Sequence, residues 1–127
     1  MANGTIAFDT LSTSGQISGT AKSVDADYLA SGSAKQWTRY NQDTPVINSS
    51  LNTSSVADTS TGKVTVNISN AFSSTTAYST SGSKNSTTYN FTISPVSASQ
   101  YIAYQRQDGG TYADASAFCF QAVGDLA

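Results

Sequence analysis

Residues 56–68, VADTSTGKVTVNI, decide the fold of this chain. The second half of this stretch alternates apolar with polar side chains, and its apolar members are Val64, Val66 and Ile68. A period of two places these side chains on one face of a β-strand, where they can enter a core. Residues 58–62 are turn-forming, and a five-residue connection containing glycine suits a hairpin with a left-handed position near its end. The stretch therefore predicts a β-hairpin.

The rest of the chain repeats short alternating runs separated by Ser, Thr, Asn and Gly. We expect further strands at residues 5–11, 34–41, 88–93, 100–106 and 117–123, with another that starts at Phe72, Ala77 and Tyr78 and fades into residues 80–83. About eight short strands, with no convincing amphipathic helix, predict an all-β fold. The expected architecture is a single antiparallel β-sandwich or jelly-roll-like domain.

The connections between these strands are less uniform. Residues 12–23 are expected to form a loop or an edge strand, and residues 24–33 fit either a helical turn or an irregular corner. Pro95 is expected to end the strand before it, because proline cannot donate to a ladder. Residues 107–110, QDGG, are typical of a hairpin turn.

The composition indicates one folded domain. A chain of 127 residues can bury a working core. Charged residues make up only 11% of it, against about 25% in typical domains. With 10% aromatic residues and a net charge of -2, the chain lacks the high charge and low aromatic content of disordered proteins. We expect residues 1–127 to form one β-sandwich module, with residues 1–33 as a candidate extended N-terminal docking arm.

Several classes of partner are disfavoured. The six Lys and Arg residues are dispersed, whereas nucleic-acid binding needs clustered cations. No apolar run approaches the ~20 residues of a membrane span, and no signal peptide opens the chain, so we expect no membrane insertion. The single cysteine, Cys119, excludes an intrachain disulfide and favours synthesis in a reducing cytosol. Between Phe118 and Phe120, Cys119 is expected to be a small buried hydrophobe.

The residue types needed for common catalytic and metal sites are missing. Without histidine, a Ser-His-Asp or Cys-His site cannot form within the chain, and one cysteine cannot supply a zinc site. Asp25 and Asp27 can pair for acid–base chemistry, but aspartates that cap their own turns are far more common. The same pair lacks the spacing of a calcium loop. We expect no enzyme activity, no catalytic residue, no cofactor and no metal ion.

Trp37 and a tyrosine–arginine group are candidate contact residues. Trp37 is expected to be a core or interface anchor rather than a sugar platform. Tyr101, Tyr104, Arg106 and Tyr112 combine tyrosine with arginine, as protein and sugar contacts do, although half-buried tyrosine pairs explain them equally well.

Five Asn-x-Ser/Thr triplets match the pattern of N-glycosylation sites, but we attribute them to the abundance of these residue types. Their asparagines are Asn48, Asn52, Asn67, Asn85 and Asn90.

The chain also resembles a known group of proteins. Residues 4–14, GTIAFDTLSTS, and residues 19–25, GTAKSVD, resemble a segment of short structural proteins and fibre-tip modules of tailed bacteriophages. A second set of motifs is similar to the C-terminal β-domains of phage tail fibres: Trp37, Tyr40-Asn41, Ile47, residues 50–56, Thr61-Gly62, residues 64–68 and the ending VGDLA of residues 123–127. The resemblance covers nearly the whole chain, with gaps around residues 78–85.

This resemblance implies a non-enzymatic virion structural protein. The implied assembly is a homotrimer that forms or tips a tail fibre, or decorates the capsid, bound to other virion proteins and in contact with a host surface glycan. The implied location is the virion, after synthesis in the host cytoplasm. A rival hypothesis is a carbohydrate-binding adhesin module that acts as a free monomer. A third is a hydrolase whose aspartates, Asp25 and Asp27 among them, share a site between subunits.

Overall fold

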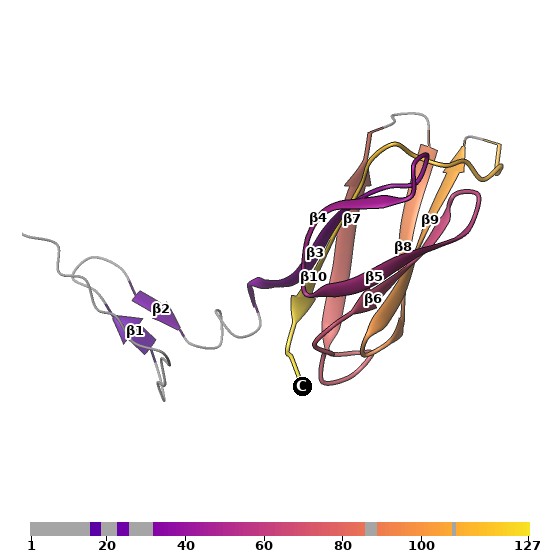
Figure 1. Ribbon diagram of the computed structural model, residues 1–127. Coiled ribbons are helices and arrows are strands. Elements are labelled where there is room, and N and C mark those ends of the chain that lie inside the picture. The colour runs from indigo at the N-terminus through magenta and orange to yellow at the C-terminus, as the bar shows by residue number, and fades with distance from the viewer. Residues whose placement is uncertain (1–15, 19–22, 26–31, 86–88, 108) are drawn as a thin grey trace, which may run out of the picture.

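Eight antiparallel strands form two four-stranded sheets in the computed structural model (Figure 1). The structure describes residues 16–18, 23–25, 32–85, 89–107 and 109–127. Sheet I has the order β4-β3-β10-β7, with β3 (Ala34–Asn41), β4 (Val46–Leu51), β7 (Tyr78–Lys84) and β10 (Phe118–Gly124). Sheet II has the order β5-β6-β9-β8, with β5 (Thr53–Ser60), β6 (Lys63–Ile68), β8 (Tyr89–Ser97) and β9 (Gln100–Gln107). The predicted β-sandwich is confirmed.

Two further strands precede the sandwich. β1 (Gln16–Ser18) and β2 (Ser23–Asp25) pair with each other in antiparallel register. The segment 12–23 therefore contains β1 and the first residue of β2, and β2 continues into the segment 24–33. The strand predicted at residues 5–11 lies outside the described residues, as does most of the segment 24–33.

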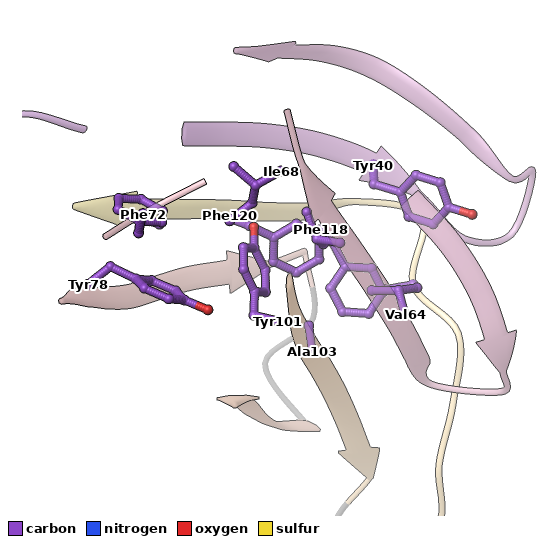
Figure 2. Packing of buried hydrophobic residues seen from close by; sticks show 12 residues of the cluster. Tyr40, Val64, Ile68, Phe72, Tyr78, Tyr101, Ala103, Phe118 and Phe120 are labelled. Carbon is purple, nitrogen blue, oxygen red and sulfur yellow. The ribbon is translucent and has the colours of Figure 1, made fainter. Parts of the chain in front are cut away.

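The core lies between the inner faces of the two sheets. β6 contributes Val64, Val66 and Ile68, as its alternation predicted, and all three are buried. Aromatic side chains from the neighbouring strand β9 and from the facing sheet fill the rest of the core. These are Tyr101 of β9 and Phe118 and Phe120 of β10, with Tyr40, Phe72 and Tyr78 around them (Figure 2). Phe120 meets Tyr101 edge to face, with 6.0 Å between ring centroids, so the two sheets interlock through their aromatic residues.

The predicted hairpin is confirmed, with a tighter turn than expected. β5 continues to Ser60 and β6 begins at Lys63, so that Thr61 and Gly62 alone connect them. A register shift between Asp58 and Ser60 absorbs the residues that were expected in the turn. Gly62 adopts a φ of +64°, and a Cβ atom there would lie 2.5 Å from the Gln105 carbonyl oxygen. Both constraints require glycine at this position.

Two predicted strand limits are wrong. β8 continues through Pro95 to Ser97. Among the described strands it is an edge strand that pairs with β9 alone, and an edge tolerates a missing donor. β7 begins at Tyr78 instead of Phe72, and it continues through the Ser/Gly-rich segment to Lys84 because every residue pairs with β10. Phe72 instead forms an isolated bridge to Leu126 and stacks on Tyr78.

The inner face of β3 is more polar than expected. Gln36 and Thr38 are buried there with Tyr40, while Trp37 faces outward and is 39% exposed. The hypothesis that Trp37 is a core anchor is therefore wrong. The physical reason is that Gln36 and Thr38 find hydrogen-bond partners inside the sandwich, which removes the cost of burying them.

Those hydrogen bonds connect the two sheets. The Gln36 amide nitrogen donates to the hydroxyls of Thr38, at 2.8 Å, and Thr53, at 2.9 Å. The Thr38 and Thr53 hydroxyls lie 2.5 Å apart, and the Tyr101 hydroxyl donates to the Gln36 amide oxygen at 3.0 Å. We call these four residues the Gln36 network. β3 supplies two of them from sheet I, and β5 and β9 supply the others from sheet II.

We expect the Gln36 network to be energetically coupled. Tyr101→Phe leaves the Gln36 amide oxygen buried without this donor, and Gln36→Leu leaves the Tyr101 hydroxyl without its acceptor. Each substitution should lower the free energy of unfolding by about 1–3 kcal/mol. The double variant should lose less than the sum of the two, because both remove the same bond. Urea unfolding of the four proteins measures this, and strictly additive losses would show that the bond contributes nothing.

Stability should also fall at alkaline pH. Burial raises the pKa of Tyr101, Tyr78 and Tyr40 above the ordinary value of 10.0, and at Tyr40 the charges of Asp58 and Asp114 raise it further. The unfolded chain releases these protons near pH 10 while the folded chain retains them. Stabilisation is therefore complete below pH 10 and is lost above it.

Tyr101 should contribute up to about 1.4 kcal/mol per pH unit to this loss. Urea unfolding from pH 8 to pH ~11.5 measures the slope, and Tyr101→Phe should reduce it. A free energy of unfolding that stays constant over this range would contradict the expectation.

Candidate functional site

The five predicted contact residues occupy three different places. Tyr101 lies in the core with no exposed surface, because it is on the inner face of β9. Tyr104 and Arg106 follow on the same strand, and Tyr112 joins them on the outer face of sheet II. Trp37 lies on the outer face of sheet I. The structure thus removes Tyr101 from the predicted tyrosine–arginine cluster and keeps its other three members together.

The cluster on sheet II lines a pocket of about 410 Å³. Its lining residues, which we call the tyrosine pocket, are Asn90, Thr92, Tyr104, Arg106 and Tyr112. The register of β8 and β9 sets Thr92 opposite Tyr104 and Asn90 opposite Arg106, so four of the five side chains come from one hairpin. A volume of this size lies within the range of pockets that hold small molecules.

The fifth side chain, Tyr112, is placed by the turn that follows β9. Gly109 and Gly110 both adopt positive φ angles, of 100° and 90°. Backbone hydrogen bonds from Gln107 to Thr111, at 2.7 Å, and from Gly110 to Gln107, at 2.9 Å, close the turn. The chain then returns beside β9, where Tyr112 forms a bridge with Arg106. The turn predicted from QDGG is present, although Asp108 itself lies outside the described residues.

Arg106 and the two tyrosines contact one another directly. The Arg106 guanidinium lies 4.7 Å from the centroid of the Tyr112 ring and donates to the Tyr112 hydroxyl at 2.5 Å. The Tyr104 and Tyr112 rings are tilted by 42°, with 6.4 Å between centroids. This bond uses one of five guanidinium N–H groups, which leaves the exposed side chain able to donate to a ligand.

The chemistry of the tyrosine pocket suits binding. It offers a cation, two aromatic rings, an amide and a hydroxyl, and none of its five lining residues carries a negative charge. A further cation stands at its edge, since the Lys63 ammonium of β6 lies 5.6 Å from the centroid of the Tyr104 ring. Such a set can hydrogen-bond and stack on a polar ligand.

Sequence reasoning missed Asn90, Thr92 and Lys63 as members of this site. None of them stands out by residue type. The signal that identifies them is register: once β9 is paired with β8 and β6, Thr92 and Lys63 both lie opposite Tyr104. Counting back from the β8–β9 turn would have found Thr92.

The outer face of sheet I has a different character. Trp37 lies opposite Leu51 of β4 on one side and opposite Gln121 of β10 on the other. Leu51 is 50% exposed, so two large apolar side chains meet solvent next to each other. Gln121 in turn donates to the Ser81 hydroxyl at 3.0 Å. We call this row of four residues the tryptophan face.

A groove of about 430 Å³ runs beside Trp37 over β3, β10 and β7. Cys119 lines it and is exposed, so the expectation of a buried Cys119 is wrong. The reason is the pleat of β10: Phe118 and Phe120 fill the core, and the residue between them must point outward. Arg39 lies opposite Cys119 in the groove.

Several of the asparagine triplets have structural roles. Asn52 adopts a left-handed φ of 54° at the corner where the chain passes from sheet I to sheet II. Its side chain donates to the Asn70 carbonyl, at 3.0 Å, and accepts from the Asn70 backbone at 2.7 Å. The amide nitrogens of Asn67 and Asn85 donate to Ser55 and Ser116. Three of the five amide groups are therefore hydrogen-bonded within the fold.

The described part of the chain lacks two other types of site. It contains no group of three or more His, Cys, Asp or Glu residues that could hold a metal ion. Nor does it contain a helix long and apolar enough to cross a membrane. Asp25 lies in β2 opposite Gln16, and Asp27 lies outside the described residues, so the predicted aspartate pair stays a hypothesis.

Comparison of the chain with family models, with curated proteins and with solved structures found no significant match.

Proposed function

We propose that this chain is a non-enzymatic structural module of a bacteriophage particle. In this proposal it forms part of a tail fibre or fibre tip, or decorates the capsid, and assembles as a homotrimer. The phage assignment and the number of three subunits rest on the sequence resemblance to tail-fibre β-domains. The structural observation that carries the proposal is the adjacent exposure of Trp37 and Leu51 on the tryptophan face.

The tryptophan face favours assembly for a physical reason. Single exposed apolar residues are normal, but a tryptophan beside a leucine on a flat sheet is typical of a protein interface. Gln121 and Ser81 supply hydrogen-bonding groups next to this apolar pair, as in the rim of many interfaces. Burial of this row between subunits would remove it from water.

The exposed sheet edges offer a second means of assembly. β7, at one edge of sheet I, has the sequence YSTSGSK and carries one charged residue, Lys84. Strand edges with few charges and no proline can pair with another chain. At the edge of sheet II, by contrast, β8 carries Pro95, which blunts that edge. Assembly through β7 and the tryptophan face would leave the outer face of sheet II open.

The presence of the chain in the particle is the direct test. Mass spectrometry of purified phage particles should detect this chain in stoichiometric amounts, and its absence would overturn the proposal.

A second candidate function, a free carbohydrate-binding adhesin module, is favoured by the tyrosine pocket. Light scattering of the purified chain separates the two, because the adhesin module is expected to be monomeric.

We expect Leu51→Asp to dissociate the trimer, because it places a charge in the apolar contact. Light scattering of the purified protein should give a molar mass of three chains for the unaltered protein and of one chain for the variant. Cys119, in the adjacent groove, should react with a maleimide slowly in the trimer and faster in the variant. Ser94→Asp on β8 is the matched control and should leave three chains. A monomeric unaltered protein would contradict the expectation.

A further inference from the structure

We propose that the tyrosine pocket binds a saccharide that carries a carboxylate, such as a uronic or sialic acid. This inference deepens the proposed function and rests on it: the role of the pocket would be contact with a host surface. It assigns to the outer face of sheet II a ligand chemistry that is separate from assembly through sheet I.

The charge at the site points to an anion. Arg106 lines the pocket and Lys63 stands at its edge, over the Tyr104 ring. The whole chain has only six Lys and Arg residues and a net charge of -2, so two cations at one pocket are a local concentration. Because none of the described residues that line the pocket is a carboxylate, these cations favour a negatively charged ligand. The planar guanidinium matches a carboxylate, to which it can donate two parallel hydrogen bonds.

The two aromatic rings point to a sugar. A flat nucleobase held between two rings needs them nearly parallel, whereas Tyr104 and Tyr112 are tilted by 42°. A pyranose chair needs only one of the rings, because its C–H groups can pack on a single aromatic face. Two cations are also fewer than the row of phosphate contacts that a nucleic-acid chain requires.

The remaining side chains complete the match. Asn90 and Thr92 are both exposed on β8, opposite Arg106 and Tyr104. An amide and a hydroxyl can each donate to and accept from the vicinal hydroxyls of a sugar ring. The hydrogen bond and ring contact between Arg106 and Tyr112 hold the guanidinium in place before the ligand arrives, which lowers the entropic cost of binding.

Matched pairs of sugars test the inference with the full chain. The probes are 3′-sialyllactose against lactose, and a galacturonic acid hexamer against its methyl ester, with AMP as a planar anion. In calorimetric titrations, at least one acidic sugar should bind about tenfold more tightly than its neutral partner and more tightly than AMP. Its affinity should fall as NaCl rises from about 50 mM to about 500 mM.

Variants identify the site. Arg106→Gln should weaken binding of the acidic sugar about tenfold or more, because it removes the charge-assisted bonds. The matched control is Arg39→Gln, because Arg39 is an exposed arginine on the outer face of sheet I, away from the pocket. This variant should change the affinity less than about twofold. Thermal unfolding should show that both variants are folded, as expected for exposed side chains.

The inference is overturned if neither acidic sugar binds, if the neutral partners or AMP bind as tightly, or if Arg39→Gln weakens binding as much as Arg106→Gln. These outcomes are distinct from a failure of the proposed function. Chains present in phage particles without sugar binding would reject the ligand alone. Sugar binding by a chain absent from the particles would reject the virion assignment alone.

Discussion

The hydrogen bonds of Gln36 between the sheets determine which face of β3 is buried, and the surfaces of the molecule follow from that choice. β3 can bury either Lys35, Trp37 and Arg39 or Gln36, Thr38 and Tyr40. The first choice would bury two charges, which costs several kcal/mol for each ion. The second buries an amide and a hydroxyl, and Thr53 and Tyr101 satisfy their hydrogen-bonding groups. The second is therefore the stable arrangement, and it leaves Trp37 outside.

The sequence predicts the fold best where alternation is both apolar and regular. β6 was predicted with the correct buried residues, because its inward positions are all apolar. On β10, by contrast, Cys119 was expected to be buried and lies on the outer face. β3 was located but its inner face was not assigned, since tryptophan attracts a core assignment more strongly than Gln36 does. The limits of β7 and β8 depend on partners: β10 extends β7 through Gly82, and the edge position lets β8 pass Pro95. Such tertiary effects override local propensity.

The candidate site was predictable to a similar degree. Tyr104, Arg106 and Tyr112 were identified by residue type and nearness in sequence, and the structure brings them together. Tyr101 was grouped with them wrongly, although the pleat of one strand must send residues 101 and 104 to opposite faces. Asn90 and Thr92 were missed because they belong to a neighbouring strand. A site on a sheet face is assembled from side chains across strands, so that register, which single-sequence patterns leave open, decides its membership.

The same register couples the tyrosine pocket to the core. On β9, Tyr101, Ala103 and Gln105 are buried while Tyr104 and Arg106 point outward, and a shift of one residue would exchange the two sets. Such a shift would bury the Arg106 charge and take Tyr101 away from Gln36, so the bond between the sheets also holds the pocket residues outward. Substitutions at Tyr104 and Arg106 therefore leave the buried face of β9 unchanged, since both side chains lie on the outer face. The pocket cannot move along the strand without breaking the network that joins the sheets.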